Sequence, residues 1–258
     1  MVDEEPAGPP HGAAVEVRGL GLRGPRGWAF RGVEFDAAPG TLTALAGPSG
    51  SGRTSLLLAL TGRMRTTEGR ASTGGYPLPG RLAAVRRVTA LGPVSGVSEL
   101  EGALTVAEHL RERALLRSRY TGPVRALLRP RRERAAVGER IAGAVEAAGL
   151  DLPALPKAGR TQARDLGRLD ALRLSVALAL LDEPRLLAVD DADLGLGGAD
   201  RAAAWELLRT VAARGTTVLA VCAEAPEGVP VVRTGPGTGP GTAGGKEAVD
   251  ACDGTGRA

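Results

Sequence analysis

The chain of 258 residues contains few aromatic residues, few cysteines and no long apolar run. Aromatic side chains make up 2% of it, so an extended stacking surface for single-stranded nucleic acid is not expected. Cys222 and Cys252 are too few and too far apart for a disulfide framework or a zinc site, which favours a reduced compartment. No apolar run approaches the ~20 residues that span a bilayer. The acidic, proline-containing residues 1–11 also lack the pattern of a signal peptide.

Lysine is almost absent as well. Lys157 and Lys246 are the two lysines among 33 basic residues, and the other 31 are arginines. The formal net charge is +4, but an arginine bias spread over the whole chain is weak evidence for phosphate binding, so we expect no nucleic-acid partner. The chain holds 38 glycines and 43% apolar residues, which is enough for one large domain with a core of alanine, leucine and valine.

Short strand-like runs alternate with longer helical patterns, which indicates an α/β domain with a largely parallel sheet. The predicted strands are Ala14–Val17, Val33–Phe35, Thr41–Ala46, Val85–Leu91, Leu186–Val189, Thr217–Val221 and an edge strand, Val229–Val232, that contains Pro230. The predicted helices are Thr54–Met64, Ala107–Arg119, Ala135–Ala148, Leu169–Leu181 and Asp200–Arg214. Between about 93 and 165 only helices are predicted, so this stretch is interpreted as an inserted helical subdomain. Residues 14–233 form the expected domain, with a disordered arm at 1–13 and a disordered glycine- and proline-rich tail at 234–258.

The most informative segment is TLTALAGPSGSGRTSLLLAL at 41–60: a buried strand, a glycine-rich turn and an apolar helix. The turn matches a phosphate-binding loop, in which glycines let successive backbone N–H groups point at a phosphate and the helix adds its positive end. The predicted phosphate-binding residues are Gly47, Pro48, Ser49, Gly50, Ser51, Gly52, Arg53, Thr54 and Ser55. The hydroxyl of Thr54 is the expected Mg²⁺ ligand. The alternative is a tight turn without phosphate, since glycine is abundant throughout the chain.

Arg53 stands where such a loop has lysine. A planar guanidinium keeps the charge but not the compact geometry of an ammonium group. Nucleotide binding tolerates this exchange better than transition-state alignment does.

A second acidic site follows the apolar run PRLLAVDD at 184–191. A nucleotide loop needs a carboxylate at the end of a neighbouring strand, so Asp190 is assigned to Mg²⁺. Asp191 is the candidate catalytic residue that positions or deprotonates the attacking water. The alternative is an ordinary strand followed by an acidic turn, since Asp193 is also present.

Together with LTVAEHL at 104–110 and GTTVLAV at 215–221, these sites resemble the nucleotide-binding domain of ABC transporters over about residues 14–222. The resemblance implies a P-loop NTPase (RecA-like) core, an N-terminal antiparallel β-subdomain and an inserted helical subdomain. It implies ATP and Mg²⁺ as ligands and a membrane-spanning transporter subunit as a partner at the inner face of the cell membrane. It also implies a homo- or heterodimer with another nucleotide-binding domain. Trp28 is the candidate for stacking on adenine, although a core tryptophan is an equal alternative.

The sequence departs from that family at several functional positions. The signature LSGGQ is replaced by LGRLD at 166–170, which places Arg168 where a second subunit's γ-phosphate would meet backbone. The Q-loop glutamine falls on Pro93, the D-loop aspartate on Gly197, the switch histidine on Ala223, and the catalytic glutamate on Asp191. We therefore expect an ATP-binding subunit with weak or impaired hydrolysis. The alternatives are a fully active ATPase and a non-hydrolysing scaffold or regulatory protein that retains the fold but has stopped binding nucleotide.

Overall fold

The computed structural model describes residues 11–25, 27–121 and 130–235. Its centre is a five-stranded sheet of order β6-β7-β8-β3-β9, in which every neighbouring pair is parallel. The strands are β3 (Leu42–Ala46), β6 (Thr89–Leu91), β7 (Leu186–Val189), β8 (Thr217–Cys222) and β9 (Val231–Arg233). The three middle strands are buried along their whole length, as expected when both faces of a parallel sheet are covered.

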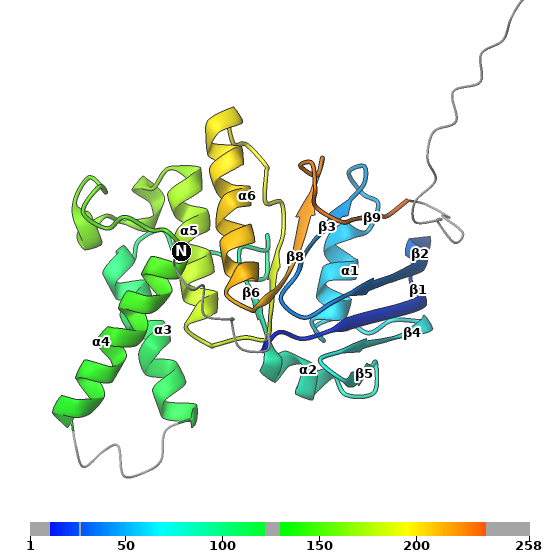
Figure 1. Ribbon diagram of the computed structural model, residues 1–258, viewed down its shortest axis with the longest axis horizontal. Helices are drawn as coiled ribbons and strands as arrows, with labels where there is room; N and C mark the ends of the chain where they lie inside the picture. Colours follow the sequence, from blue (N-terminus) through cyan, green and yellow to red (C-terminus); the bar gives the residue numbers. More distant parts are fainter. Residues whose placement is uncertain (1–10, 26, 122–129, 236–258) are drawn as a thin grey trace, which may run out of the picture.

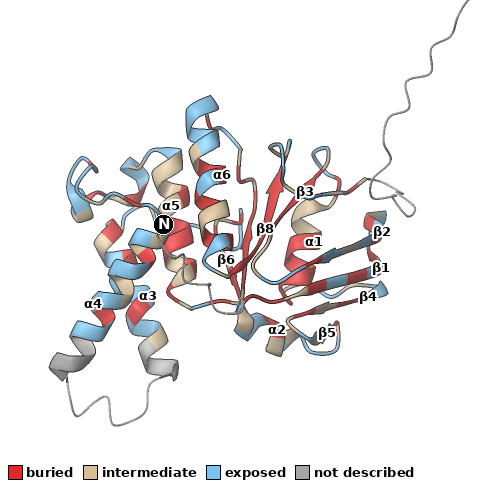
Figure 2. Cartoon of the chain, viewed as in Figure 1, coloured by how far each residue is buried: buried red, intermediate tan, exposed pale blue. Residues whose placement is uncertain are grey.

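Helices cover both faces of this sheet (Figure 1). On one face lie α5 (Arg168–Leu180) and α6 (Gly198–Ala213); α1 (Arg53–Leu60) lies on the other, between the parallel sheet and a second sheet. The buried residues concentrate along β3 and β8 and on the helix faces turned toward them (Figure 2). The predicted α/β P-loop architecture is therefore observed.

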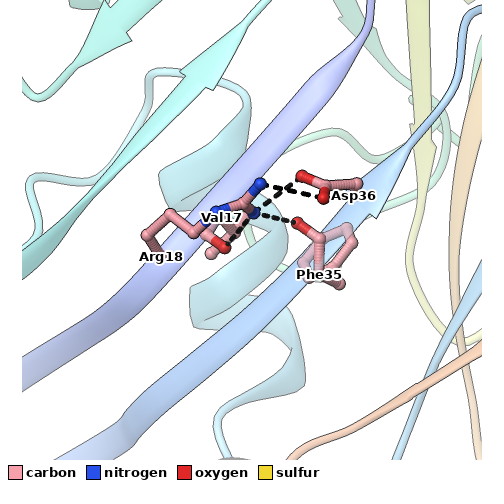
Figure 3. Close-up of polar contacts among 4 residues, drawn as sticks. All are labelled: Val17, Arg18, Phe35 and Asp36. Carbon is pink, nitrogen blue, oxygen red and sulfur yellow. Dashed lines mark hydrogen bonds and ion pairs between the residues drawn. The ribbon is translucent and has the colours of Figure 1, made fainter. Parts of the chain in front are cut away.

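The second sheet is antiparallel and has the order β2-β1-β4-β5. It contains β1 (Val15–Gly24), β2 (Gly27–Ala37), β4 (Glu68–Thr73) and β5 (Tyr76–Leu78). Val15, Val17 and Leu20 of β1 face the core that this sheet shares with α1, and the strand register shifts between Val17 and Leu20. On the exposed side of this sheet, Arg18 of β1 and Asp36 of β2 form an ion pair through two hydrogen bonds, with N···O distances of 2.7 and 2.9 Å (Figure 3). The hydrogen bond from Arg18 lowers the pKa of Asp36.

The helical insertion contains α3 (Val106–Thr121) and α4 (Pro130–Ala147), which pack with α5. Two 3₁₀ turns, Ala158–Arg160 and Ala163–Asp165, connect it back to the core. Within the described ranges, no helix combines the length and the hydropathy needed to cross a bilayer.

The predicted strand Val85–Leu91 is wrong over its first half. Residues Leu82–Val88 form helix α2, and only Thr89–Leu91 continue as β6. Val85 is buried while Arg86 and Arg87 are not, a spacing that suits a short amphipathic turn of helix. Strands β4 and β5 were not predicted, and the helix expected over Thr54–Met64 ends at Leu60 because Gly62 adopts a φ of 72°.

The predicted ends of the domain need a correction, although most of the arm and tail lies outside the described residues. Ala13 is fully buried and its N–H donates to the carbonyl of Arg185 at 2.8 Å. Thr234 is 3% exposed and its N–H donates to the carbonyl of Ala46 at 2.9 Å. Ala13 and Thr234 belong to the segments predicted to be disordered, yet both are buried and hydrogen-bonded to the folded domain.

Candidate nucleotide-binding site

The glycine-rich loop joins the carboxyl end of β3 to the first turn of α1. Gly50 and Gly52 have φ values of 79° and 80°, in the region that favours glycine. Gly52 is the N-cap of α1; no side chain caps this helix and its first turn carries no acidic residue. The N–H groups of the first turn are therefore free of a competing side-chain acceptor, as an anion site at a helix N-terminus requires.

The surroundings of the glycines show how the loop is held. A Cβ on Gly52 would lie 2.1 Å from the carbonyl oxygen of Ala29 in β2, and a Cβ on Gly47 would lie 2.4 Å from that of Thr234. A Cβ on Gly50 would meet no described atom within 4 Å. The loop is thus enclosed by β2 and the end of β9 and open at Gly50.

The open side faces a cavity of about 850 Å³, within the size range of ligand pockets. Its lining combines most of the loop with one residue of β2, residues that follow β7 and β8, and the last residue of β9: Ala29, Gly47, Pro48, Ser49, Gly50, Gly52, Arg53, Thr54, Ser55, Asp191, Asp193, Leu194, Ala223 and Arg233. Eight of the nine predicted phosphate-loop residues therefore line one cavity.

Ser51 is the exception. It is 4% exposed, and its hydroxyl lies 2.7 Å from that of Thr234, beneath the loop. Its backbone N–H donates to the carbonyl of Pro48 at 3.1 Å. The Ser51 side chain therefore anchors the loop to the end of β9 and does not face the cavity.

Arg53 lines the cavity and reaches across to β8. Its guanidinium donates to the carbonyl of Cys222 at 2.5 Å. Burial raises the pKa of the Cys222 thiol to about 11, so this cysteine is a neutral core residue. Arg53, at the lysine position, is therefore hydrogen-bonded to the carboxyl end of β8.

Thr54, which lines the cavity, is hydrogen-bonded to Asp190, which lies outside the lining of this cavity. The Thr54 hydroxyl donates to Oδ2 of Asp190 at 2.8 Å, and the Asp191 N–H donates to Oδ1 at 3.2 Å. Asp190 is 5% exposed, and burial raises the pKa of its carboxyl although the Thr54 hydrogen bond opposes the shift.

This oxygen pair fits Mg²⁺. The ion takes few protein ligands and retains water and phosphate oxygens, so a hydroxyl beside one carboxylate is sufficient. Within the described ranges, no group of three or more His, Cys, Asp or Glu side chains forms an all-protein metal cluster.

Asp191 directly follows Asp190, and its backbone has a φ of 47°, an uncommon conformation for a residue with a side chain. It lines the nucleotide-loop cavity and also a second cavity of about 300 Å³ that contains Pro93 and Arg168. Pro93 joins this region through its backbone, since its carbonyl accepts the Asp190 N–H at 3.0 Å. Asp191, the predicted catalytic residue, therefore lies beside Thr54 and Asp190, the two predicted Mg²⁺ ligands.

Trp28 lies outside the cavity lining, although its neighbour Ala29 belongs to it. The half-buried indole has the guanidinium of Arg31 4.6 Å and that of Arg23 5.7 Å from its ring centre. Stacking of adenine on Trp28 stays a prediction.

The replaced signature lies at the start of α5. Gly167 is the N-cap, and Nε of Arg168 donates to the carbonyl of Leu194 at 2.9 Å. Ala223, at the switch position, donates its N–H to Asp193 at 3.3 Å. Arg168 and Ala223, which replace family signature and switch residues, thus both form hydrogen bonds within their own chain.

Sequence analysis does not identify Ala29, Leu194 and Arg233 in the cavity lining, or Thr234 beneath the loop. The signal was available in part, because the predicted edge strand Val229–Val232 ends at this point. Its pairing with β3, which carries the loop, was not visible in the pattern.

Comparison with known proteins agrees with this geometry. A family model described as "ABC transporter" matches residues 30–193. The Nod factor export ATP-binding protein I of Burkholderia pseudomallei is 32% identical over 192 residues, covering 73% of this chain and 55% of that protein. ATP-binding cassette sub-family A member 7 of Mus musculus is 32% identical over 210 residues, covering 81% of this chain and 9% of that protein. The chain spans about half the length of the bacterial relative.

Solved structures show the same fold at lower identity. The dimeric bacterial ABC transporter cassette MJ0796 superposes with a TM-score of 0.65 at 19% identity, covering 85% of this chain and 94% of that chain. The cbiO1 subunit from Clostridium perfringens, part of the complex cbiONQ, gives a TM-score of 0.63 at 17% identity, covering 81% and 78%. The family match covers more than half of the sequence and contains both the phosphate loop and the Asp190–Asp191 pair. The chain belongs to the ABC transporter family.

Proposed function

We propose that the chain is the ATP-binding subunit of an ABC-type transporter and binds Mg-ATP in the cavity of the phosphate loop, with weak hydrolysis of its own. The observation that carries this proposal is the cavity itself. The uncapped start of α1, the open Gly50 position and Thr54 border the same space, and the Thr54 hydroxyl donates to the carboxylate of Asp190.

The phosphates and the Mg²⁺ of Mg-ATP each have matching groups. The phosphates meet the N–H groups of the first turn of α1 and the charge of Arg53. Thr54 and Asp190 would hold Mg²⁺, which would neutralise charge on the phosphates. The carboxylate of Asp190 must be ionised for this role, and a bound cation lowers the pKa that burial raises.

Weak hydrolysis follows from the groups around Asp191. Its carboxylate is one methylene shorter than glutamate, so a water placed for in-line attack is harder to reach. Ala223 offers no imidazole and Pro93 offers no side-chain amide. The nearby Asp193 accepts a hydrogen bond from the Ala223 backbone. Binding groups are thus better preserved than groups that activate water.

The partners follow from the family. We infer a separate membrane-spanning subunit, which holds this chain at the inner face of the membrane, and a second nucleotide-binding domain of the same or another sequence. The cassette MJ0796 is described as dimeric, and cbiO1 as part of a larger complex. A partner domain with an intact signature supplies the groups that LGRLD lacks.

The test is titration of the purified chain with Mg-ATP, together with a phosphate-release assay. We expect saturable binding, a large loss of affinity in Arg53→Ala, and phosphate release close to background. Phosphate release that Asp191→Asn abolishes would instead identify an active ATPase. Absence of nucleotide binding would refute the proposal and favour the scaffold alternative.

A further inference from the structure

The edge strand β9 brings an arginine to the phosphate loop. Arg233 is the last residue of β9 and pairs with Ala46, the residue immediately before Gly47. Its exposed side chain contributes to the lining of the nucleotide cavity. Within the described part of the chain, its guanidinium has no hydrogen-bond or ion-pair partner, whereas seven other arginines are ion-paired.

The backbone of Arg233 is fixed relative to the loop by the next residue. Thr234 donates its N–H to the Ala46 carbonyl, its hydroxyl bonds that of Ser51, and its own carbonyl lies against Gly47. The two segments are 183 positions apart in the sequence, so these contacts set the distance between Arg233 and the loop. A side chain carried on such a rigid support loses little backbone freedom when it binds a ligand.

The two cations in the cavity lining differ in their engagement. Arg53 already donates to the Cys222 carbonyl at the β8 edge, so part of its guanidinium is occupied. Arg233 approaches from the opposite neighbour of β3, because the sheet order is β8-β3-β9. A chain of phosphates lying over the loop would therefore have one arginine on each side. Of these two arginines, Arg233 is the one whose guanidinium donors are all unengaged within the described residues.

We propose that Arg233 binds the phosphate chain of the nucleotide and supplies a charge-assisted contact that Arg53 alone does not. The ligand class is a polyphosphate, and the guanidinium fork matches two phosphate oxygens. This inference rests on the proposed function, since it adds a binding residue to the same cavity.

The test compares wild type, Arg233→Ala, Arg233→Lys and the matched control Arg70→Ala. Arg70 is exposed on β4, away from the cavity, and its replacement removes the same charge. Binding of Mg-ATP is measured by calorimetry, and inorganic tripolyphosphate and adenosine are measured as competitors. We expect Arg233→Ala to weaken Mg-ATP and tripolyphosphate about tenfold, adenosine to be unaffected, and Arg233→Lys to recover part of the loss. Arg70→Ala should bind like wild type.

The outcomes separate this inference from the proposed function. If wild type binds no Mg-ATP, both are refuted. If wild type binds and loses affinity in Arg53→Ala but not in Arg233→Ala, only the Arg233 contact is refuted. A loss for Mg-ATP without a loss for tripolyphosphate would place Arg233 against the nucleoside and overturn the phosphate contact. Unchanged affinity with a weaker nucleotide-dependent dimer would assign Arg233 to the interface instead. Thermal melting of each variant identifies any loss of fold.

Discussion

Gly50 and Gly52 provide a paired test of the loop geometry, because their φ values are nearly equal and their surroundings are opposite. Both backbones are in the left-handed region, at 79° and 80°. Alanine at Gly50 would place its Cβ in open space at the cavity, whereas alanine at Gly52 would place it 2.1 Å from the backbone oxygen of Ala29. The same substitution therefore isolates the effect of the surroundings.

The magnitudes follow from two contributions. A left-handed alanine costs about 1–2 kcal/mol relative to glycine, and this cost applies to both variants. The contact with Ala29 cannot be relieved by a side-chain rotation, so Gly52→Ala adds an overpacking cost of about 1–3 kcal/mol. We expect Gly50→Ala to lose about 1–2 kcal/mol of unfolding free energy and Gly52→Ala about 2–5 kcal/mol.

The assay is urea unfolding of both variants at equal protein concentration, followed by Mg-ATP titration under conditions in which each is folded. Gly50→Ala should remain folded but lose nucleotide affinity, because its new methyl group projects into the cavity. Equal destabilisation of the two variants would show that β2 does not press on the loop as the structure has it. Wild-type ATP affinity in folded Gly50→Ala would show that phosphates do not occupy this side of the loop.

Two further substitutions test the role of Asp190 in Mg²⁺ binding and the role of Trp28 in adenine binding. Asp190→Asn should melt higher than wild type near pH 8, since burial raises the folded pKa of Asp190 and makes its ionised form unfavourable in the folded protein. This difference in melting temperature should shrink as the pH falls through the folded pKa. The substitution should also lower the Mg²⁺-dependent part of ATP affinity about tenfold or more. A difference between variant and wild type that is the same at pH 8 and pH 5 would contradict the assignment. Trp28→Ala should lower ATP affinity about tenfold if the indole stacks on adenine. A loss of stability of about 1 kcal/mol with unchanged ATP affinity would assign Trp28 to its contacts with Arg23 and Arg31 alone.

The features predicted well from the sequence are those set by neighbouring residues. The strand, glycine turn and helix at 41–60 fold as one local unit, and a short apolar strand that ends in two aspartates places both at the sheet edge. The parallel topology then brings Asp190 to Thr54, although 136 positions separate them. Local pattern plus the topology of parallel strands was sufficient for these contacts.

The features that were missed depend on packing between distant segments. The run Val85–Leu91 has too few residues for hydrophobic periodicity to distinguish a helical turn from a strand. Ser51 reads as a phosphate ligand in the linear motif, but the hydroxyl of Thr234 draws it beneath the loop. Nothing near residue 234 in the sequence indicates this partner, so neither the role of Ser51 nor the nearby Arg233 was predicted.

The replaced signature shows a different kind of adjustment, because Arg168 fits a complementary space in its own chain. Its side chain lies over Gly195, where a Cβ would come within 3.0 Å of Nε, and the same Nε donates to the adjacent Leu194 carbonyl. Gly195 has a φ of 69° and therefore favours glycine on backbone grounds as well. Arg168 thus links the start of α5 to the segment that follows Asp191. The Nε–H of Arg168 is therefore committed to a contact within its own chain, at the position where the family signature has a residue without a long side chain.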